Sequence, residues 1–188
     1  MAIKIFVDQG HNPRNPNSGA EGNGYREQDI TYTVGTQLAA LLNADQNFEV
    51  LTSRKDPNQI LGTSNATSLK ERVQEANLWG ADYFISVHTN ASVIDNAQGT
   101  EGYVYSFDSP ATELSRSIVD SISEATGFPN RGVFENPSFY VLRKTKMPAT
   151  LIELGFITTK SEADLMANEP QIFANAIYIG ILNYFGLN

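Results

Sequence analysis

The two histidines of the chain, His11 and His88, lie at or just after the ends of segments that predict β-strands. The first segment is Ile3 to Asp8, and the second is the apolar run from Ala81 to His88. In an open parallel sheet the carboxyl ends of the strands lie together, and ligands bind there. We therefore expect the two imidazoles to share one site. The alternative is that each histidine ends its strand and bonds only to backbone groups.

Two neutral imidazoles and one carboxylate form a usual ligand set for a catalytic zinc ion whose fourth position stays open. The chain has no cysteine and no third histidine, so the remaining ligand must be an aspartate or a glutamate. The candidates that follow the first strand are Glu21, Glu27 and Asp29. Glu27 directly precedes a predicted helix, where a negative charge also stabilises the helix N-terminus. The residue types alone leave the third ligand open.

Glu153 stands inside an apolar segment, between Leu151 and Leu154. A carboxylate in such surroundings is costly to bury unless it is paired or otherwise compensated. Near a zinc ion, a partly buried glutamate suits general acid–base catalysis, because its pKa can be tuned toward the working pH. The alternative is a structural glutamate that bonds to Arg131, Arg143 or a backbone amide.

Three further residues are candidates for binding a substrate. Arg131 and Arg143 are basic residues in an acidic chain, and their paired N–H donors could hold a substrate carboxylate. Asn90 follows His88 by two positions and could bond a substrate amide. For both arginines, an ordinary place on the surface is the alternative.

Strand and helix signals alternate along most of the chain and predict the scaffold that must position these residues. Ser68 and Glu71 fit a capping box that opens one of the helices. We expect strands at residues 3–8, 48–52, 81–88, 100–105, 139–142 and 149–154, and helices at about residues 30–42, 68–79, 110–125 and 170–184. This order predicts a single α/β domain with an open, mostly parallel, twisted sheet of about six strands and helices on both faces.

Composition excludes several classes of function. The 188 residues suit one domain, and 41% hydrophobic residues can build a packed core. The 21 acidic residues exceed the 13 lysines and arginines, and the net charge of -8 argues against nucleic-acid binding or a polybasic membrane patch. No apolar run approaches the roughly 20 residues of a membrane span. Neither a phosphate-binding glycine loop nor a serine nucleophile motif is present.

At these residues the chain resembles the zinc-dependent N-acetylmuramoyl-L-alanine amidases of the Amidase_3 family. The resemblance extends over nearly the whole length, and its motifs occur in order and at the family's spacing. The segments that carry it are Ile5 to His11, Ser18 to Ala20, Gly22 to Glu27, Ser68 to Arg72, Phe84 to Asn90, Gly102 to Tyr105, Arg131 to Val133, Phe139 to Arg143 and Met147 to Ile157. Residues around the first histidine depart from the family's usual pattern, which affects loop shape but removes no ligand.

The resemblance implies a role for each polar residue. The family's zinc ligands fall on His11, Glu27 and His88, which would hold one Zn2+ ion, and its catalytic glutamate falls on Glu153. Residues 1–188 would then form a single zinc amidase catalytic domain. The implied reaction is hydrolysis of the amide bond between the lactyl group of N-acetylmuramic acid and L-alanine in bacterial peptidoglycan, with a zinc-activated water and Glu153 as general acid and base.

An enzyme with this substrate works outside the cell, at the bacterial cell wall, although residues 3–8 are too short and too alternating for the apolar stretch of a signal peptide. We expect peptidoglycan as partner, a monomer, and neither nucleic acid nor membrane; a separate cell-wall-binding module would lie outside this chain. An autolysin, a phage endolysin and a spore enzyme all fit. The alternatives to an amidase are a zinc peptidase that cuts within the stem peptide and a wall-binding domain with a vestigial site.

Overall fold

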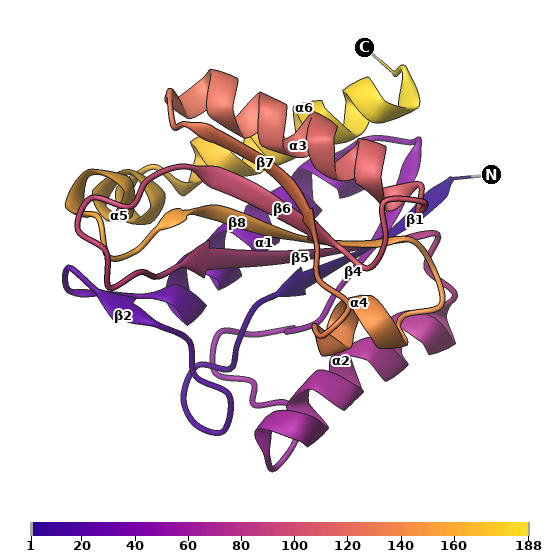
Figure 1. The fold of residues 1–188 in the computed structure, drawn as a ribbon. Helices are drawn as coiled ribbons and strands as arrows, with labels where there is room; N and C mark the ends of the chain where they lie inside the picture. The colour runs from indigo at the N-terminus through magenta and orange to yellow at the C-terminus, as the bar shows by residue number, and fades with distance from the viewer. Residues whose placement is uncertain (1, 188) are drawn as a thin grey trace.

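The computed structural model describes residues 2–187. These residues form eight strands and six helices, and six of the strands make up one main sheet (Figure 1). The strands are β1 (Ile3–Gln9), β2 (Glu21–Gly22), β3 (Tyr25–Arg26), β4 (Phe48–Thr52), β5 (Tyr83–Asn90), β6 (Thr100–Val104), β7 (Asn130–Glu135) and β8 (Ala149–Phe156). The helices are α1 (Glu27–Ala44), α2 (Asn65–Trp79), α3 (Ala111–Thr126), α4 (Tyr140–Lys144), α5 (Lys160–Asn168) and α6 (Pro170–Phe185).

The main sheet has six strands in the order β4-β1-β5-β8-β6-β7, and β2 pairs with β3 in a separate hairpin. Neighbouring strands of the main sheet run parallel except β6 and β8, which pair antiparallel. In the central strand β5, Phe84, Ile85 and Val87 are fully buried, as expected of a strand covered on both faces. The predicted α/β fold with an open, mostly parallel sheet is confirmed.

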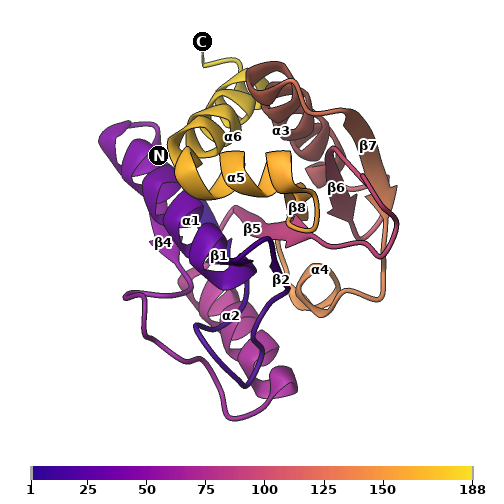
Figure 2. The ribbon, with the colours of Figure 1, turned by 90° about the vertical axis from the view of Figure 1, so that its left-hand side faces the viewer.

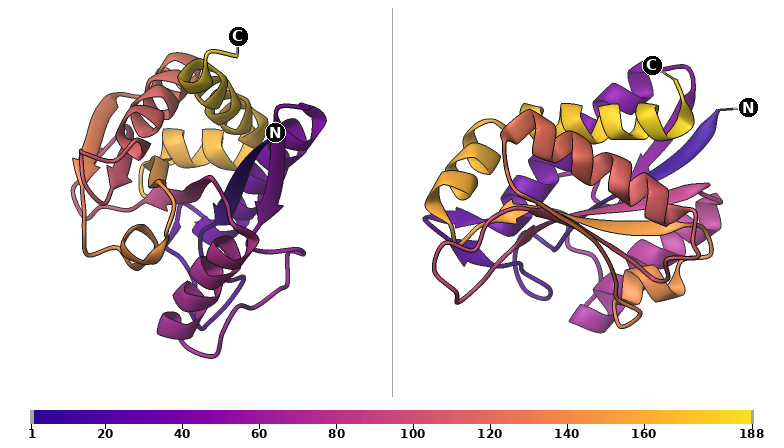
Figure 3. Two further views of the ribbon diagram at one scale, coloured as in Figure 1. Left: turned by 90° about the vertical axis from the view of Figure 1, so that its right-hand side faces the viewer. Right: turned by 45° about the horizontal axis from the view of Figure 1, so that its top comes forward.

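Helices cover both faces of the sheet in two unequal layers. The larger layer consists of α1, α3, α5 and α6, and it encloses Val34, Ile118 and Ile177 against one face. The smaller layer consists of α2 and α4 on the opposite face, where the rings of Phe6 and Phe84 stack with their centroids 5.4 Å apart. Figures 2 and 3 show the two layers from the sides. Residues near the carboxyl ends of β1, β5 and β8 line one cavity together with residues of α2 and α4 from the smaller layer.

The observed elements differ from the sequence prediction at one strand and add four elements, of which β2 and β3 form the short hairpin before α1. Residues 139–142, expected as a strand, form the start of the helix α4, in which Val141 and Leu142 are buried. A short apolar run does not distinguish a buried strand from a buried helix, so the periodicity was insufficient here. The strand β7 was not predicted, because it lies at the sheet edge and has no buried residue. The short helix α5 was also not predicted.

Helix α2 begins one turn before the predicted position. Its N-cap is Ser64, whose hydroxyl accepts a hydrogen bond from the backbone N–H of Thr67 at 3.2 Å, and Thr67 Oγ1 accepts one from Ser64 N at 2.8 Å. Ser68, expected as the cap, is buried inside the helix and accepts a hydrogen bond from Asn17 Nδ2 at 3.1 Å. The prediction of a capping box at Ser68 is wrong because Thr67 takes the place of the usual Glu or Gln.

We expect Ser64→Ala to lower the free energy of unfolding by about 1 kcal/mol, because the variant loses the N-cap of α2. Urea denaturation of this variant and of Thr63→Ala, which alters the neighbouring exposed hydroxyl, measures the difference. Equal stability of the two variants would show that Ser64 does not cap the helix.

Candidate metal centre and catalytic cavity

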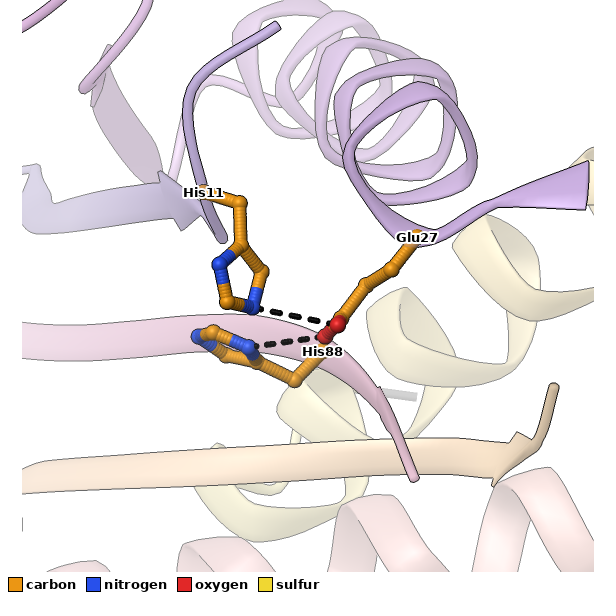
Figure 4. A group of neighbouring side chains, drawn as sticks. All are labelled: His11, Glu27 and His88. Atoms are coloured by element: carbon orange, nitrogen blue, oxygen red, sulfur yellow. Dashed lines mark hydrogen bonds and ion pairs between the residues drawn. The ribbon is translucent and has the colours of Figure 1, made fainter. Parts of the chain in front are cut away.

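Three side chains from separate parts of the sequence meet at the carboxyl edge of the main sheet (Figure 4). His11 follows the end of β1, Glu27 is the first residue of α1, and His88 lies near the end of β5. Nε2 of His11 is 3.1 Å from Oε2 of Glu27, and Nδ1 of His88 is 3.0 Å from Oε1 of the same carboxylate. One ligand atom from each residue lies within 4.8 Å of the others, so the three could hold a single metal ion.

The buried carboxylate of Glu27 also accepts two hydrogen bonds from the backbone. Ala20 N donates to Oε2 at 2.8 Å, and Thr89 N donates to Oε1 at 3.0 Å. Burial alone would raise the pKa of Glu27, but the hydrogen bonds with His11 and His88 outweigh it and hold the pKa well below its usual range. Glu27 is therefore a carboxylate at neutral pH, the form that a metal ion needs.

The two other carboxylates that the sequence offered lie apart from the imidazoles. The side chains of Glu21 and Asp29 are 69% and 60% exposed, and both are close to Arg26 instead. Glu27 combines the two roles that the sequence left open, since it begins a helix and also faces both histidines. The helix N-terminus adds to the stabilisation of its negative charge.

Two glycines allow the close approach of these side chains. A Cβ atom on Gly10 would lie 2.6 Å from Cε1 of His88, and one on Gly19 would lie 2.7 Å from Oε2 of Glu27. Both distances are shorter than any real contact, so larger residues would displace the site. His11 itself has φ 67°, in the left-handed region that residues other than glycine rarely adopt and that is enriched at functional sites.

A buried ion pair holds the backbone that carries His11. Arg72, on α2, donates to Asp8 Oδ1 at 2.6 Å, to the carbonyl of Gln9 at 2.6 Å and to the carbonyl of His11 at 2.5 Å. Ser86 donates to the other oxygen of Asp8 at 2.8 Å. Burial opposes the charge of Asp8, but Arg72 outweighs it and lowers the pKa of Asp8. Sequence reasoning missed this pair, although an aspartate within an apolar strand was a signal of it.

Glu153 lies in β8 directly beside His88 and faces a cavity of about 340 Å³. Residues of the β1–α1 loop, α2, α4 and the strand ends line this cavity, among them His11, Glu27, Leu69, Tyr140 and Glu153. Oε2 of Glu153 is buried and has no hydrogen-bond partner among residues 2–187. Burial first, and then the negative charges of Glu27 and Glu101, raise the pKa of Glu153 well above its usual value. The alternative of a Glu153–arginine pair does not occur among these residues.

Arg131 instead pairs with Glu101, a buried carboxylate that the sequence reasoning did not single out. Nε of Arg131 and the hydroxyl of Tyr103 both donate to Glu101, and Asn90 Nδ2 donates to it at 2.7 Å. Asn90 lines the cavity, whereas Arg131 and Arg143 lie outside its lining. The signal for Glu101 was an acidic residue in an otherwise uncharged strand.

An open α/β sheet with two histidines and a glutamate at its carboxyl edge, beside a further glutamate in the cavity, is typical of a hydrolase, and the first three residues could hold a metal ion. The comparisons with known proteins agree with this class. Residues 5–183 match the family model Amidase_3, described as N-acetylmuramoyl-L-alanine amidase. The chain therefore belongs to the N-acetylmuramoyl-L-alanine amidase family, whose members' activity supports the predicted hydrolysis of the peptidoglycan amide.

Named relatives and solved structures carry the same description. The chain is 36% identical over 164 residues to the sporulation-specific N-acetylmuramoyl-L-alanine amidase of Bacillus subtilis, covering 86% of this chain and 59% of that relative. It is 36% identical to the amidase CwlM of Bacillus licheniformis, covering 99% of this chain and 70% of CwlM. The crystal structure of an N-acetylmuramoyl-L-alanine amidase from Clostridium difficile 630 superposes with a TM-score of 0.87 at 32% identity, over 98% of this chain and 97% of that one.

If His11, Glu27 and His88 hold a zinc ion, Arg72→Lys should weaken its binding, and we expect it to lower the free energy of unfolding by about 2 kcal/mol, because a lysine cannot span Asp8 and the two backbone carbonyls at once. Zinc titration and urea denaturation measure the two effects. Arg116→Lys, at an exposed arginine of α3 that pairs with Glu113, is the matched control. If Arg72→Lys bound zinc as tightly as the control, the ion pair would have no part in holding the metal centre.

Proposed function

We propose that this chain is a single catalytic domain of a zinc-dependent N-acetylmuramoyl-L-alanine amidase. The substrate is peptidoglycan, and the bond cleaved is the amide between the lactyl group of N-acetylmuramic acid and L-alanine. The observation that carries the proposal is the meeting of His11, Glu27 and His88 beside Glu153, whose buried Oε2 has no hydrogen-bond partner within residues 2–187. The family match over residues 5–183 supplies the identity of the bond.

The donor set suits one zinc ion held by His11, Glu27 and His88. Imidazole nitrogens and a carboxylate oxygen are common zinc ligands, and three protein ligands leave a position for substrate or water. When bound, the ion supplies Lewis acidity, which polarises the scissile carbonyl and makes a water molecule a better nucleophile at neutral pH. The backbone N–H groups of Ala20 and Thr89 keep the carboxylate of Glu27 oriented toward the two imidazoles.

Glu153 moves the protons in this proposal. In its ionised form it takes a proton from the attacking water, and in its protonated form it gives a proton to the nitrogen of the departing L-alanine. Its raised pKa suits both steps, because a carboxyl group that is buried and close to Glu27 and Glu101 holds a proton more firmly than an exposed one.

Asn90, Arg131 and Arg143 are proposed to contact the substrate around the scissile bond. Asn90 is supported by its place in the cavity lining, where it could bond a substrate amide. Arg131 is held beside Asn90 by their shared partner Glu101, and its side chain is 42% exposed. Arg143 belongs to α4, whose residues Tyr140 and Val141 line the cavity. Both arginines are proposed to receive carboxylates of the stem peptide.

The enzyme is proposed to act as a monomer at the extracellular face of the bacterial cell, where peptidoglycan lies. Among residues 2–187, no helix has the length and apolar character needed to cross a membrane. A separate wall-binding module is proposed to assist the enzyme, because a chain of net charge -8 gains little electrostatic attraction to an often anionic cell wall. One structural neighbour, the CwlD amidase of Clostridioides difficile, was solved in complex with the GerS lipoprotein, which supports a protein partner as another route to targeting.

Digestion of purified peptidoglycan by the zinc-loaded protein tests the reaction. We expect mass spectrometry to find intact stem peptides with a new L-alanine amino group and glycan strands that keep free muramic lactate. Stem peptides that are shortened internally would instead identify a zinc peptidase. The absence of any cleavage product with added zinc would identify a binding domain.

Two substitutions separate the proton carrier from a metal ligand. We expect Glu153→Gln to keep one zinc ion per chain and to lower kcat by about 10²- to 10⁴-fold, because only proton transfer is removed. We expect His88→Ala to lose the metal. Elemental analysis and kinetic assays measure both, with Glu124→Gln at an exposed glutamate of α3 as control. Wild-type turnover in Glu153→Gln, or full zinc content in His88→Ala, contradicts the respective role.

A further inference from the structure

The exposed large aromatic side chains gather at one edge of the molecule. Within residues 2–187 only Tyr105, Phe107 and Phe134 belong to this class, with 49%, 48% and 42% of their surface exposed. Tyr105 directly follows β6 and Phe134 belongs to β7, the edge strand beside it. Phe107 N donates to the side chain of Glu135, the last residue of β7, at 2.6 Å. Such a concentration of exposed aromatic side chains indicates a binding surface.

Phe134 is the exposed end of a row of three rings that leads to the catalytic cavity. Its ring centroid is 5.8 Å from that of Tyr103, which is its partner in the β6–β7 pairing. The ring of Tyr103 is 5.3 Å from that of Phe139, which lines the cavity. We call Phe134, Tyr103 and Phe139 the aromatic row. In Figure 2, β7 and α4 lie on the same side of the molecule, away from α1 and β4.

The aromatic row suits the glycan strand of the proposed substrate better than it suits the stem peptide. A stem peptide carries amides and carboxylates, which need hydrogen-bond partners, and the one polar atom of the three rings, the hydroxyl of Tyr103, already donates to Glu101. A glycan strand presents the apolar C–H faces of its sugar rings and, with its lactyl groups joined to peptides as amides, carries little charge of its own. Aromatic rings offer flat apolar faces to such groups at a small cost in conformational entropy.

We propose that the aromatic row is a glycan-binding subsite, on which sugar rings of the peptidoglycan strand stack while the scissile amide lies beside Glu153. This inference rests on the proposed amidase function, because that function places the scissile amide beside Glu153 and thereby orients the glycan strand. Phe134 then contacts sugars beyond the muramic acid that is attacked. The aromatic row therefore favours binding of long glycan strands over binding of isolated muramoyl peptides.

Binding of glycan strands from which the stem peptides have been removed tests the surface without any turnover. We expect wild-type protein to bind these strands and Phe134→Ala to bind about tenfold more weakly, the loss of one good ring contact. Phe134→Leu keeps most of the apolar area and removes the ring face, so it should also lose binding. Ile179→Ala, at a side chain of α6 that is 47% exposed, is the control and should bind like wild type. Equal binding by all four proteins, or no binding by wild type, overturns the proposal.

Hydrolysis distinguishes the glycan from the stem peptide as occupant. We expect kcat/KM of Phe134→Ala to fall about tenfold on a substrate with several linked disaccharides and to stay unchanged on a single N-acetylmuramoyl peptide. An equal fall on both substrates would place the stem peptide on the row and overturn the proposal. If wild-type protein cleaved neither substrate, the amidase function would fail, while the binding of stripped strands would still decide the glycan subsite.

Discussion

The buried carboxylate of Glu27 imposes the constraint on which the rest of the site depends. A negative charge removed from water must be met by donors or cations, or folding is strongly opposed. Here the partners come from two separate parts of the chain: Ala20 and His11 in the β1–α1 loop, and Thr89 and His88 in β5. Satisfying one carboxylate therefore closes the β1–α1 loop over the sheet edge and brings both histidines to the same place.

Other acidic residues lie around this carboxylate. Whether each one is paired with an arginine indicates whether its role is structural or catalytic. Asp8 is paired with Arg72, and Glu101 is paired with Arg131. Both pairs hold backbone or side chains beside the cavity. Glu153 differs, because its buried Oε2 has no hydrogen-bond partner in residues 2–187. A buried carboxyl group without compensation is costly, and such a group in a cavity next to a metal centre is typical of a residue that carries protons.

The sequence was sufficient for features that depend on local patterns and insufficient for those that depend on distant contacts. His11 and His88 could be placed at one edge because each follows a strand that its own residues predict. Glu27 could be separated from its acidic neighbours only by family resemblance, since helix capping and metal binding favour the same residue there. The bonds of Arg72 join positions about 60 residues apart, which no local pattern encodes. The helix α4 was mistaken for a strand because its apolar run is short.

The central claim is that His11, Glu27 and His88 hold one catalytic zinc ion beside Glu153. Diffraction from crystals of the zinc-loaded protein, recorded above and below the zinc absorption edge, tests this claim most directly. The account predicts one anomalous peak among Nε2 of His11, Nδ1 of His88 and the Glu27 carboxylate, with Glu153 facing the same cavity. An anomalous peak elsewhere, or none with zinc in excess, would contradict it.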